Sequence, residues 1–422
     1  QGLIRHIEYA SNAEDAYDTA LESAVRIGFG YWRVLSDYES PDSFNQSLFV
    51  KRIRNSFMVY IDPLAQEMDG SDMQWAFIVD DLPIASFKAM YPNADEVNFD
   101  QDSTGQASAS WLSEESIRIA EYFYYETENS TLCLLDNGRA LFEDELYEGA
   151  VVVKRRKAER KRIKWCKFTH AQVLEKTDWV GRWIPIVPVY GDEIDIEGKV
   201  TRSGIVRFSK DPQRMYNYWK TTETELVALA PKAPYIGAAG QFEGYEDQWE
   251  QANTRSFPYL EYNAQSSNGL TMGAPQRQPF AGAPAGVITA ALSASDDIKA
   301  TTGIFDASLG SKGNETSGRA IMARQKEGDT ANFHYADNQS KAIRHTGRIL
   351  IDLIPHYYDA PRTVRILGED GSAEPVEVNK QLPAPEMDEQ TGAIKTVLND
   401  LTVGTYDVTV SVGQSYSTKR ME

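Results

Sequence analysis

The chain has 422 residues, of which 41% are apolar and 25% charged, an ordinary composition for a globular protein. This length predicts two or three domains. The formal net charge of −19 excludes a protein that coats nucleic acid through a uniformly basic surface, and no run approaches the roughly 18 apolar residues of a membrane-spanning helix.

Two cysteines, Cys133 and Cys166, and five scattered histidines show no metal-binding spacing. We therefore expect reduced thiols, no disulfide framework and no zinc site. We expect no signal peptide. It opens with Gln1 inside a helical pattern and ends at Glu422 without a stop signal, which predicts a piece of a longer protein.

The first half of the chain is predicted to be rich in strands. Apolar residues at helical spacing predict one helix over residues 3–29, ended by Gly28 and Gly30. Alternating or β-branched runs then predict strands at 31–35, 48–53, 58–61 and 75–79, a short helix near 83–90, a strand-rich region over 117–190, and a hairpin made of 194–200 and 204–208.

The second half is predicted to be dominated by helices. Asp211 suits an N-cap and Pro212 a first helical residue, so a helix is expected from there to about 230. After it we expect strands at 234–236 and 259–262 around a helix over 244–253, a helix at 285–302, a Gly- and Ser-rich loop, a helix at 318–358, and strands at 363–367, 375–378 and 406–412. Globular helices usually run about 8–20 residues, so the helix at 318–358 is unusually long, and Gly328 and Gly347 are expected to weaken or kink it.

A basic run places eight cations within the eleven residues from Lys154 to Lys164. Three interpretations fit it: direct contact with nucleic acid or a localisation patch, a charged hairpin tip or strand edge, and pairing with a neighbouring acidic surface. The candidate contact residues are Lys154, Arg155, Arg156, Lys157, Arg160, Lys161 and Arg162.

No catalytic constellation stands out in the sequence. Paired carboxylates at 80–81, 143–145 and 192–195 have no nearby histidine and fall on expected turns or strand ends, which favours solvated turns over acid/base or metal chemistry. The glycines between 303 and 318 match no phosphate-binding or dinucleotide fingerprint, and no Gly-x-Ser-x-Gly elbow occurs. We expect no catalytic residue, no metal, no cofactor and no enzyme activity.

The loop at 305–317 carries one cation, Lys312, two acids, Asp306 and Glu315, and several small polar residues. It fits two interpretations. It is either a solvent-exposed connection, or a segment whose hydroxyls, amides and lysine touch a phosphate backbone without gripping it.

Several long strings resemble the portal protein of short-tailed phages of the P22 type. They are Asp-Asp-Ile-Lys-Ala-Thr-Thr-Gly-Ile-Phe-Asp-Ala-Ser-Leu-Gly at 296–310, Asn-Glu-Thr-Ser-Gly-Arg-Ala-Ile-Met-Ala-Arg-Gln at 314–325, and further matches at 229–234, 342–355 and 365–371. The resemblance covers most of the chain and is strongest from about 205 to 375. The family's chain is longer at both ends.

The resemblance implies an α+β portal fold with a mixed α/β wing, a two-helix stem, a small α/β clip and a long helix behind a tunnel loop. In this sequence these would be the wing at 1–208, stem helices at 209–230 and 285–303, the clip at 231–284, the tunnel loop at 304–317, the long wing helix at 318–358 and the second part of the wing at 359–422. A C-terminal crown or barrel would be missing.

The resemblance also implies two sets of site residues. The DNA-facing tunnel loop would present Ser308, Ser311, Lys312, Asn314 and Glu315. The clip interface would use Tyr235, Phe242, Tyr245, Trp249 and Tyr259, some of which must also fill the core of so small a segment. In a ring, Lys312 would recur around the axis as a circle of charge.

The implied function is a ring, usually dodecameric, at one capsid vertex, through which double-stranded DNA is packaged and later ejected. Implied partners are the terminase large subunit, tail or adaptor proteins, and capsid and scaffolding proteins, with no membrane. The protein would be found in the virion, and in the host cytoplasm during assembly. The alternatives are a structural capsid or head–tail connector component without direct DNA contact, and a packaging ATPase or nuclease, against which the missing phosphate-binding loop argues.

Overall fold

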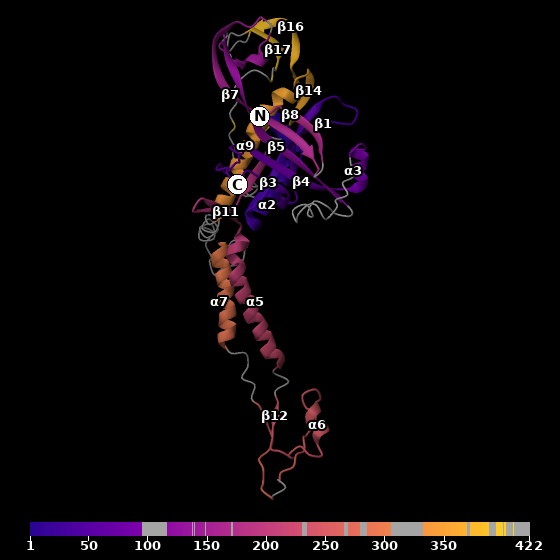
Figure 1. The fold of residues 1–422 in the computed structure, drawn as a ribbon. Helices are drawn as coiled ribbons and strands as arrows, with labels where there is room; N and C mark the ends of the chain where they lie inside the picture. The colour runs from indigo at the N-terminus through magenta and orange to yellow at the C-terminus, as the bar shows by residue number, and fades with distance from the viewer. Residues whose placement is uncertain are drawn as a thin grey trace, which may run out of the picture. The chain divides into compact units, whose positions relative to one another are not determined.

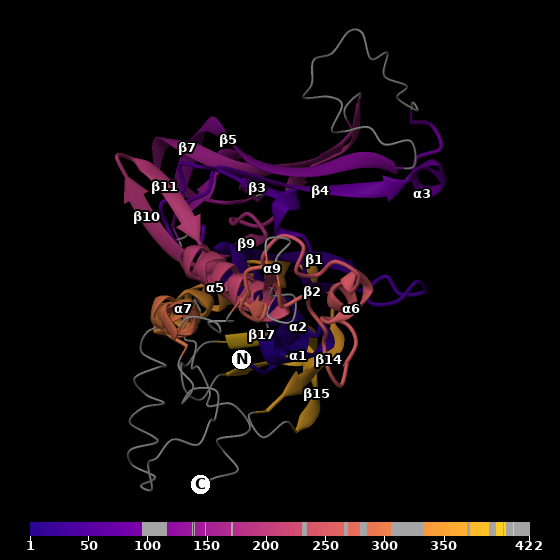
Figure 2. The same cartoon turned by 90° about the horizontal axis from the view of Figure 1, so that it is seen from below.

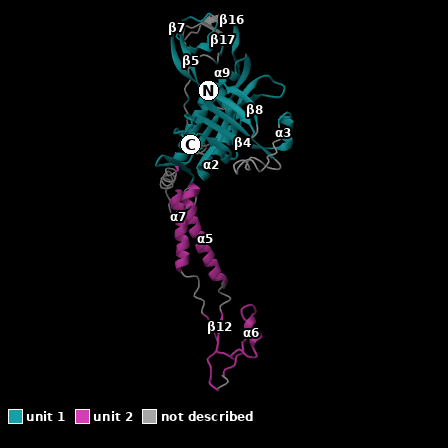
Figure 3. Ribbon diagram, viewed as in Figure 1, with its two compact units in different colours: residues 1–204, 333–422 teal, residues 205–332 magenta. Residues whose placement is uncertain are grey.

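The fold is seen in a computed structural model of the chain (Figure 1). It describes residues 1–94, 116–136, 138, 140–147, 149–169, 172–229, 234–265, 269–278, 285–304, 332–368, 372–387, 394–399, 401 and 408. The chain divides into two compact units, Gln1–Gly204 with Phe333–Glu422 (unit 1) and residues 205–332 (unit 2) (Figure 3). The described residues contain both α-helices and antiparallel β-sheets, in agreement with the predicted α+β class.

The predicted N-terminal helix is in fact two helices, α1 (Gly2–Ala10) and α2 (Ala13–Ile27). They are separate because Asn12 is left-handed, with a φ of 49°, a conformation that its short polar side chain tolerates. The hydroxyl of Ser11 donates to the carbonyl of Ile7 and accepts from the backbone N–H of Val50. The break therefore anchors the helix pair to a neighbouring strand. Gly28 ends α2, as predicted.

A three-stranded antiparallel sheet forms the middle layer of unit 1, in the order β2-β1-β9 (Figure 2). Its strands are β1 (Phe29–Tyr38), β2 (Gln46–Arg52) and β9 (Ile186–Tyr190). Successive side chains of a strand point to opposite faces. Trp32 and Val187 accordingly join one buried cluster, while Tyr31 and Ile186 join another. Both faces of this small sheet are thus covered by apolar packing.

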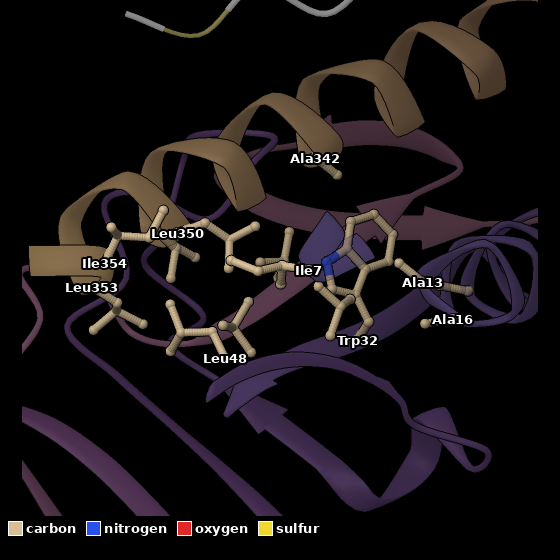
Figure 4. Close-up of a cluster of buried hydrophobic side chains, with 14 of the residues drawn as sticks. Ile7, Ala13, Ala16, Trp32, Leu48, Ala342, Leu350, Leu353 and Ile354 are labelled. Carbon is tan, nitrogen blue, oxygen red and sulfur yellow. The ribbon is translucent and has the colours of Figure 1, made fainter. Parts of the chain in front are cut away.

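The first cluster lies between this sheet and the helices α1, α2 and α9 (Phe333–Tyr357) (Figure 4). The alanines of α2 allow the helix to approach the sheet closely. Gly30, which was expected to end the helix, instead lies in β1, where a Cβ would stand 1.9 Å from the carbonyl oxygen of Ala20. Any larger residue at position 30 would push α2 away from the sheet.

Trp32 lies fully buried in this cluster, and its indole Nε1 donates to Oγ1 of Thr346 at 2.8 Å. Thr346→Val keeps the side-chain shape but leaves the indole N–H without a partner, at a cost of about 1–3 kcal/mol. We expect a lower thermal midpoint for the valine variant than for Thr346→Ser, which retains the hydroxyl, as measured by circular dichroism. Equal midpoints would show that this hydrogen bond adds nothing to stability.

The second cluster lies between the small sheet and a six-stranded antiparallel sheet of order β3-β4-β5-β7-β8, with β6 paired to β5. The strands are β3 (Val59–Ile61), β4 (Trp75–Pro83), β5 (Ser116–Leu135), β6 (Ala140–Phe142), β7 (Val152–Phe168) and β8 (Val173–Trp179), and helix α3 (Ile84–Met90) follows β4. The predicted strands and short helix of this region are confirmed. Both cysteines are buried and free.

The long helix differs from its prediction at its start. Asn332 is in a turn and α9 begins at Phe333, while residues 305–331, including Gly328, lie outside the described residues. A Cβ at Gly347 would stand 2.7 Å from the side chain of Val408, so this glycine provides room for a neighbour. Strands β14 (Arg362–Leu367) and β15 (Ala373–Val378) were predicted, whereas β16 (Lys380–Met387) and β17 (Ile394–Leu398) were not. The expected strand at 406–412 is outside the described residues, apart from residue 408.

Unit 2 begins with a helix where a strand was expected. The hairpin is β10 (Asp192–Ile196) with β11 (Lys199–Ser203), so the strand predicted at 204–208 is wrong, and α5 runs from Ile205 to Leu229. Pro212 lies inside α5 rather than at its first turn, because α5 begins earlier, at Ile205. Helix α5 packs against α7 (Ala285–Thr302). Helix α7 has its predicted bounds.

The part of unit 2 between these helices is small. Strands β12 (Tyr235–Ile236) and β13 (Gln276–Arg277) pair with each other, and α6 (Glu246–Gln251) lies within the predicted helical range. Residues 259–262 form no strand, so that prediction is wrong. The partner strand of β12 is formed by residues 276–277 instead.

Candidate functional site

The helices α5 and α7 pack against each other along one narrow seam. On α7 the seam contains Ala291 and Ala294, which are 1% and 4% exposed. On α5 the half-buried residues are Ile205, Ser209, Pro212, Tyr216, Trp219, Thr222, Glu223 and Leu226, and apart from the neighbours Thr222 and Glu223 they recur every three or four positions. This period is typical of one helix face packed on a partner helix.

The other faces of this helix pair carry exposed apolar side chains. They are Val206, Phe208, Met215, Tyr218 and Val227 on α5, and Ile288 and Leu292 on α7, with exposures of 41–63%. Among the described residues of the two helices only the two seam alanines are buried. A helix pair that buries so little and exposes so many apolar side chains has the character of a protein–protein contact surface.

The predicted clip residues separate into a packed group and an exposed one. Trp249 packs edge-to-face with Tyr235 and Phe242, at centroid distances of 5.0 and 4.9 Å, and its indole N–H donates to the carbonyl of Glu261 at 2.7 Å. Tyr259, in contrast, is 70% exposed. Tyr245 is half-buried and precedes α6 as its N-cap. Trp249, Tyr235 and Phe242 therefore form a small core, and Tyr259 remains available to a partner.

The basic run forms most of β7, and nearby acids neutralise part of it. Arg160 contacts Asp144, at 2.7 Å, and Glu145, while Arg162 also contacts Asp144. Arg155 lies 3.8 Å from Glu143. These three acids form one short turn of 3-10 helix, η2 (Glu143–Glu145). Pairing with an acidic neighbour is thus the outcome for Arg155, Arg160 and Arg162.

Lys164, at the end of the run, contacts Asp178 at 2.7 Å. The other four cations lie on an edge of the sheet. Strand β7 pairs with β5 along its length but with β8 only from Ile163 onward. Lys154, Arg156, Lys157 and Lys161 are exposed there, and no ion pair joins them to any residue that the structure describes. Charges on an edge strand oppose pairing with a further strand. These four residues remain the candidates for direct contact with nucleic acid.

The paired carboxylates are exposed, as predicted, except for the half-buried Asp192. Asp81 accepts two hydrogen bonds from the guanidinium of Arg118, at 2.7 and 2.9 Å, and these bonds lower the pKa of the Asp81 carboxyl. Asp192 has a histidine beside it after all, since the fold places Nε2 of His334 2.7 Å from its Oδ1. No group of three or more His, Cys, Asp or Glu side chains suited to a metal ion occurs among the described residues.

The predicted tunnel-loop residues Ser308, Ser311, Lys312, Asn314 and Glu315 lie outside the residues that the structure describes. The described helices nearest to them in the sequence are α7 before them and α9 after them. Across the described segments, no helix has the length and apolar character needed to cross a bilayer.

A family model described as phage P22-like portal protein matches residues 1–422. The chain belongs to this portal family. A portal protein of Acyrthosiphon pisum secondary endosymbiont phage 1 is 26% identical over 444 residues, a match that covers 99% of this chain and 60% of that protein. The chain therefore spans about three fifths of the length of this portal relative. The family resemblance seen in the residues is confirmed, while the roles of individual portal segments stay predictions.

Proposed function

We propose that this chain is a portal subunit whose copies form a ring-shaped channel at one capsid vertex, through which the phage genome is packaged and ejected. Membership of the portal family supports the role. The observation that carries the ring is the helix pair α5 and α7, which buries two alanines and leaves seven apolar side chains exposed. Copies of the same pair placed side by side would cover these side chains, as repeated contacts in a closed ring do.

In this proposal α5 and α7 are the stem, residues 231–284 the clip, and residues 304–317 the tunnel loop that faces the DNA. A channel that passes DNA in both directions must not bind it tightly. An acidic chain, with a net charge of −19, repels phosphates over most of its surface. Lys312, with Ser308, Ser311, Asn314 and Glu315 around it, supplies weak contacts that salt and water exchange readily.

The remaining proposals concern partners. The ring would be dodecameric and located in the virion, after assembly in the host cytoplasm with capsid and scaffolding proteins. The clip would dock the terminase large subunit during packaging and tail or adaptor proteins later. On β7, Lys154, Arg156, Lys157 and Lys161 pair with no acid that the structure describes, and they are the residues able to meet DNA phosphates.

A packaging assay tests the proposed function. Capsids assembled with this protein should protect added DNA from nuclease in the presence of terminase and ATP. Capsids assembled without it should not. Equal protection in both preparations would contradict a role as the entry channel for the genome.

The clip gives a further prediction with an internal control. Tyr259→Ala should weaken terminase binding severalfold without unfolding the clip, because Tyr259 is 70% exposed. Trp249→Ala removes the centre of the clip core instead and should destabilise it by about 3–5 kcal/mol. Surface plasmon resonance with terminase and tryptic digestion of the clip separate the two effects. Wild-type affinity in the Tyr259 variant would remove this residue from the interface.

A further inference from the structure

The chain crosses between its two units twice. It leaves unit 1 after Gly204 and returns at Phe333. The residues just before the first crossing and just after the second contact the same short segment, residues 190–192, at the end of β9 and the start of β10. The contacts of this stretch lie within unit 1 and decide how firmly each crossing is held.

The outgoing crossing is fixed by close backbone packing. Asp192 is paired in register with Ser203, one residue before Gly204. The N–H of Gly191 donates to the carbonyl of Gly28 at 2.9 Å. A Cβ at Gly191 would stand 2.7 Å from the carbonyl oxygen of Ser203, and one at Gly204 would stand 2.5 Å from the backbone of Arg26. Backbone atoms cannot move aside as a side chain does, so this end of β11 has little freedom.

Hydrogen bonds from the first turns of α9 hold the returning crossing. Nδ2 of Asn338 donates to the carbonyl of Tyr190 at 3.0 Å and lies 3.4 Å from that of Gly191. The hydroxyl of Tyr335 donates to Oδ2 of Asp192 at 3.3 Å. Tyr335 and Asn338 are only 5% and 6% exposed. Polar groups buried to this degree are costly unless they are hydrogen-bonded, so these contacts specify one position for the helix start.

The electrostatic environment at the start of α9 also favours the contact between the Asp192 carboxylate and Tyr335. Its carboxylate faces the first turn of α9, where the helix dipole stabilises negative charge. Burial, with Asp192 nearby, raises the pKa of Tyr335 to about 12, so the hydroxyl keeps its proton and remains a donor near neutral pH. Nε2 of His334 lies 2.7 Å from Oδ1 of Asp192 without forming a hydrogen bond to it.

We infer that Asp192, Tyr335 and Asn338 are positioning residues that hold the returning chain against the outgoing chain. Asp192 pairs through its backbone with the last strand before unit 2, and its carboxylate accepts a hydrogen bond from α9. The points at which the chain leaves and re-enters unit 1 then share one support within unit 1. This inference rests on the proposed function, in which residues 205–332 contain the stem and the tunnel loop. Loosening the support would let the loop shift relative to the DNA without preventing ring formation.

Hydrogen exchange tests the contact itself. In Asp192→Ala, and in Tyr335→Phe, the amides of residues 334–342 should exchange about tenfold faster, the effect of losing one hydrogen bond to a charged group. The double variant should exchange no faster than the quicker single variant, because both changes remove the same bond. Asp192→Asn keeps an acceptor oxygen and should restore most of the protection. Asp195→Ala, at an exposed position of the same hairpin, is the matched control and should match the wild type.

If the effects of the two single changes on amide exchange were additive in the double variant, the hydrogen bond between Asp192 and Tyr335 would not be the shared cause.

A packaging assay then tests whether this contact matters for DNA packaging. Asp192→Ala should form rings of normal size but retain less DNA, whereas Asp195→Ala should package as the wild type does. Wild-type packaging by an Asp192→Ala protein with fast exchange would overturn the positioning role. If the wild type itself packages no DNA, the proposed function fails, and the exchange result still decides whether the contact fixes α9.

Discussion

Replacing Leu292 with glutamate is expected to prevent ring assembly while each subunit keeps its fold. Leu292 is 63% exposed on α7, one turn from Ile288, which is 41% exposed. The two side chains form one apolar ridge beside the seam with α5. Burial of a leucine contributes about 1.5–3 kcal/mol, and a ring repeats the contact at every interface. A glutamate at the same place is a charge without a partner, which opposes burial.

Sedimentation velocity measures this effect directly. The Leu292→Glu protein should sediment as monomers or small open oligomers under conditions in which the wild type forms one large species. Ser293→Glu adds the same charge at the next exposed position without removing apolar surface, so it should assemble normally. If both variants give the wild-type species, the exposed face of α7 is not an interface between copies.

Removal of Lys312 is expected to impair DNA translocation or retention while rings still form. The lysine is the one cation of the segment 305–317, so its loss leaves that segment with only negative charge, from Asp306 and Glu315. Each ring would lose a full circle of phosphate contacts, and we expect at least a severalfold drop in retained DNA. Deletion of residues 308–315 should have a larger effect.

Nuclease-protected DNA in filled capsids is the readout for Lys312→Ala, and electron microscopy confirms that the rings are intact. Lys199→Ala is the matched control, because Lys199 is an exposed lysine of β11, away from the loop sequence. Unchanged packaging by both the Lys312 variant and the deletion would favour the alternative of a connector component without direct DNA contact.

Local patterns predicted most of the elements, and the errors have identifiable physical causes. Alternation of apolar and polar residues located the strands of the large sheet, and helical spacing gave α7 its bounds. Residues 205–208 of the strand expected at 204–208 are instead in α5, whose half-buried residues follow a helical period, so packing along one helix face outweighs the β-branched composition. The break at Asn12 depends on one left-handed residue, and apolar spacing carries no signal for such a residue.

The candidate site was predictable mainly through the family, since the residues on their own left each alternative open. Composition identified the basic run, but only the fold shows that η2 neutralises Arg155, Arg160 and Arg162. The contact of Asp192 with His334 and Tyr335 joins residues more than 140 positions apart, and no local pattern reveals it. A His-Tyr-x-x-Asn string at the start of a helix was the available signal, because it places polar side chains on one face.

Electron-microscope class averages of the purified protein test the central claim most directly. The account predicts closed rings with a central hole wide enough for double-stranded DNA, present over a range of salt and protein concentrations. Leu292→Glu should abolish them and Ser293→Glu should not. Monomers or open aggregates of the wild-type protein under all of these conditions would contradict the account.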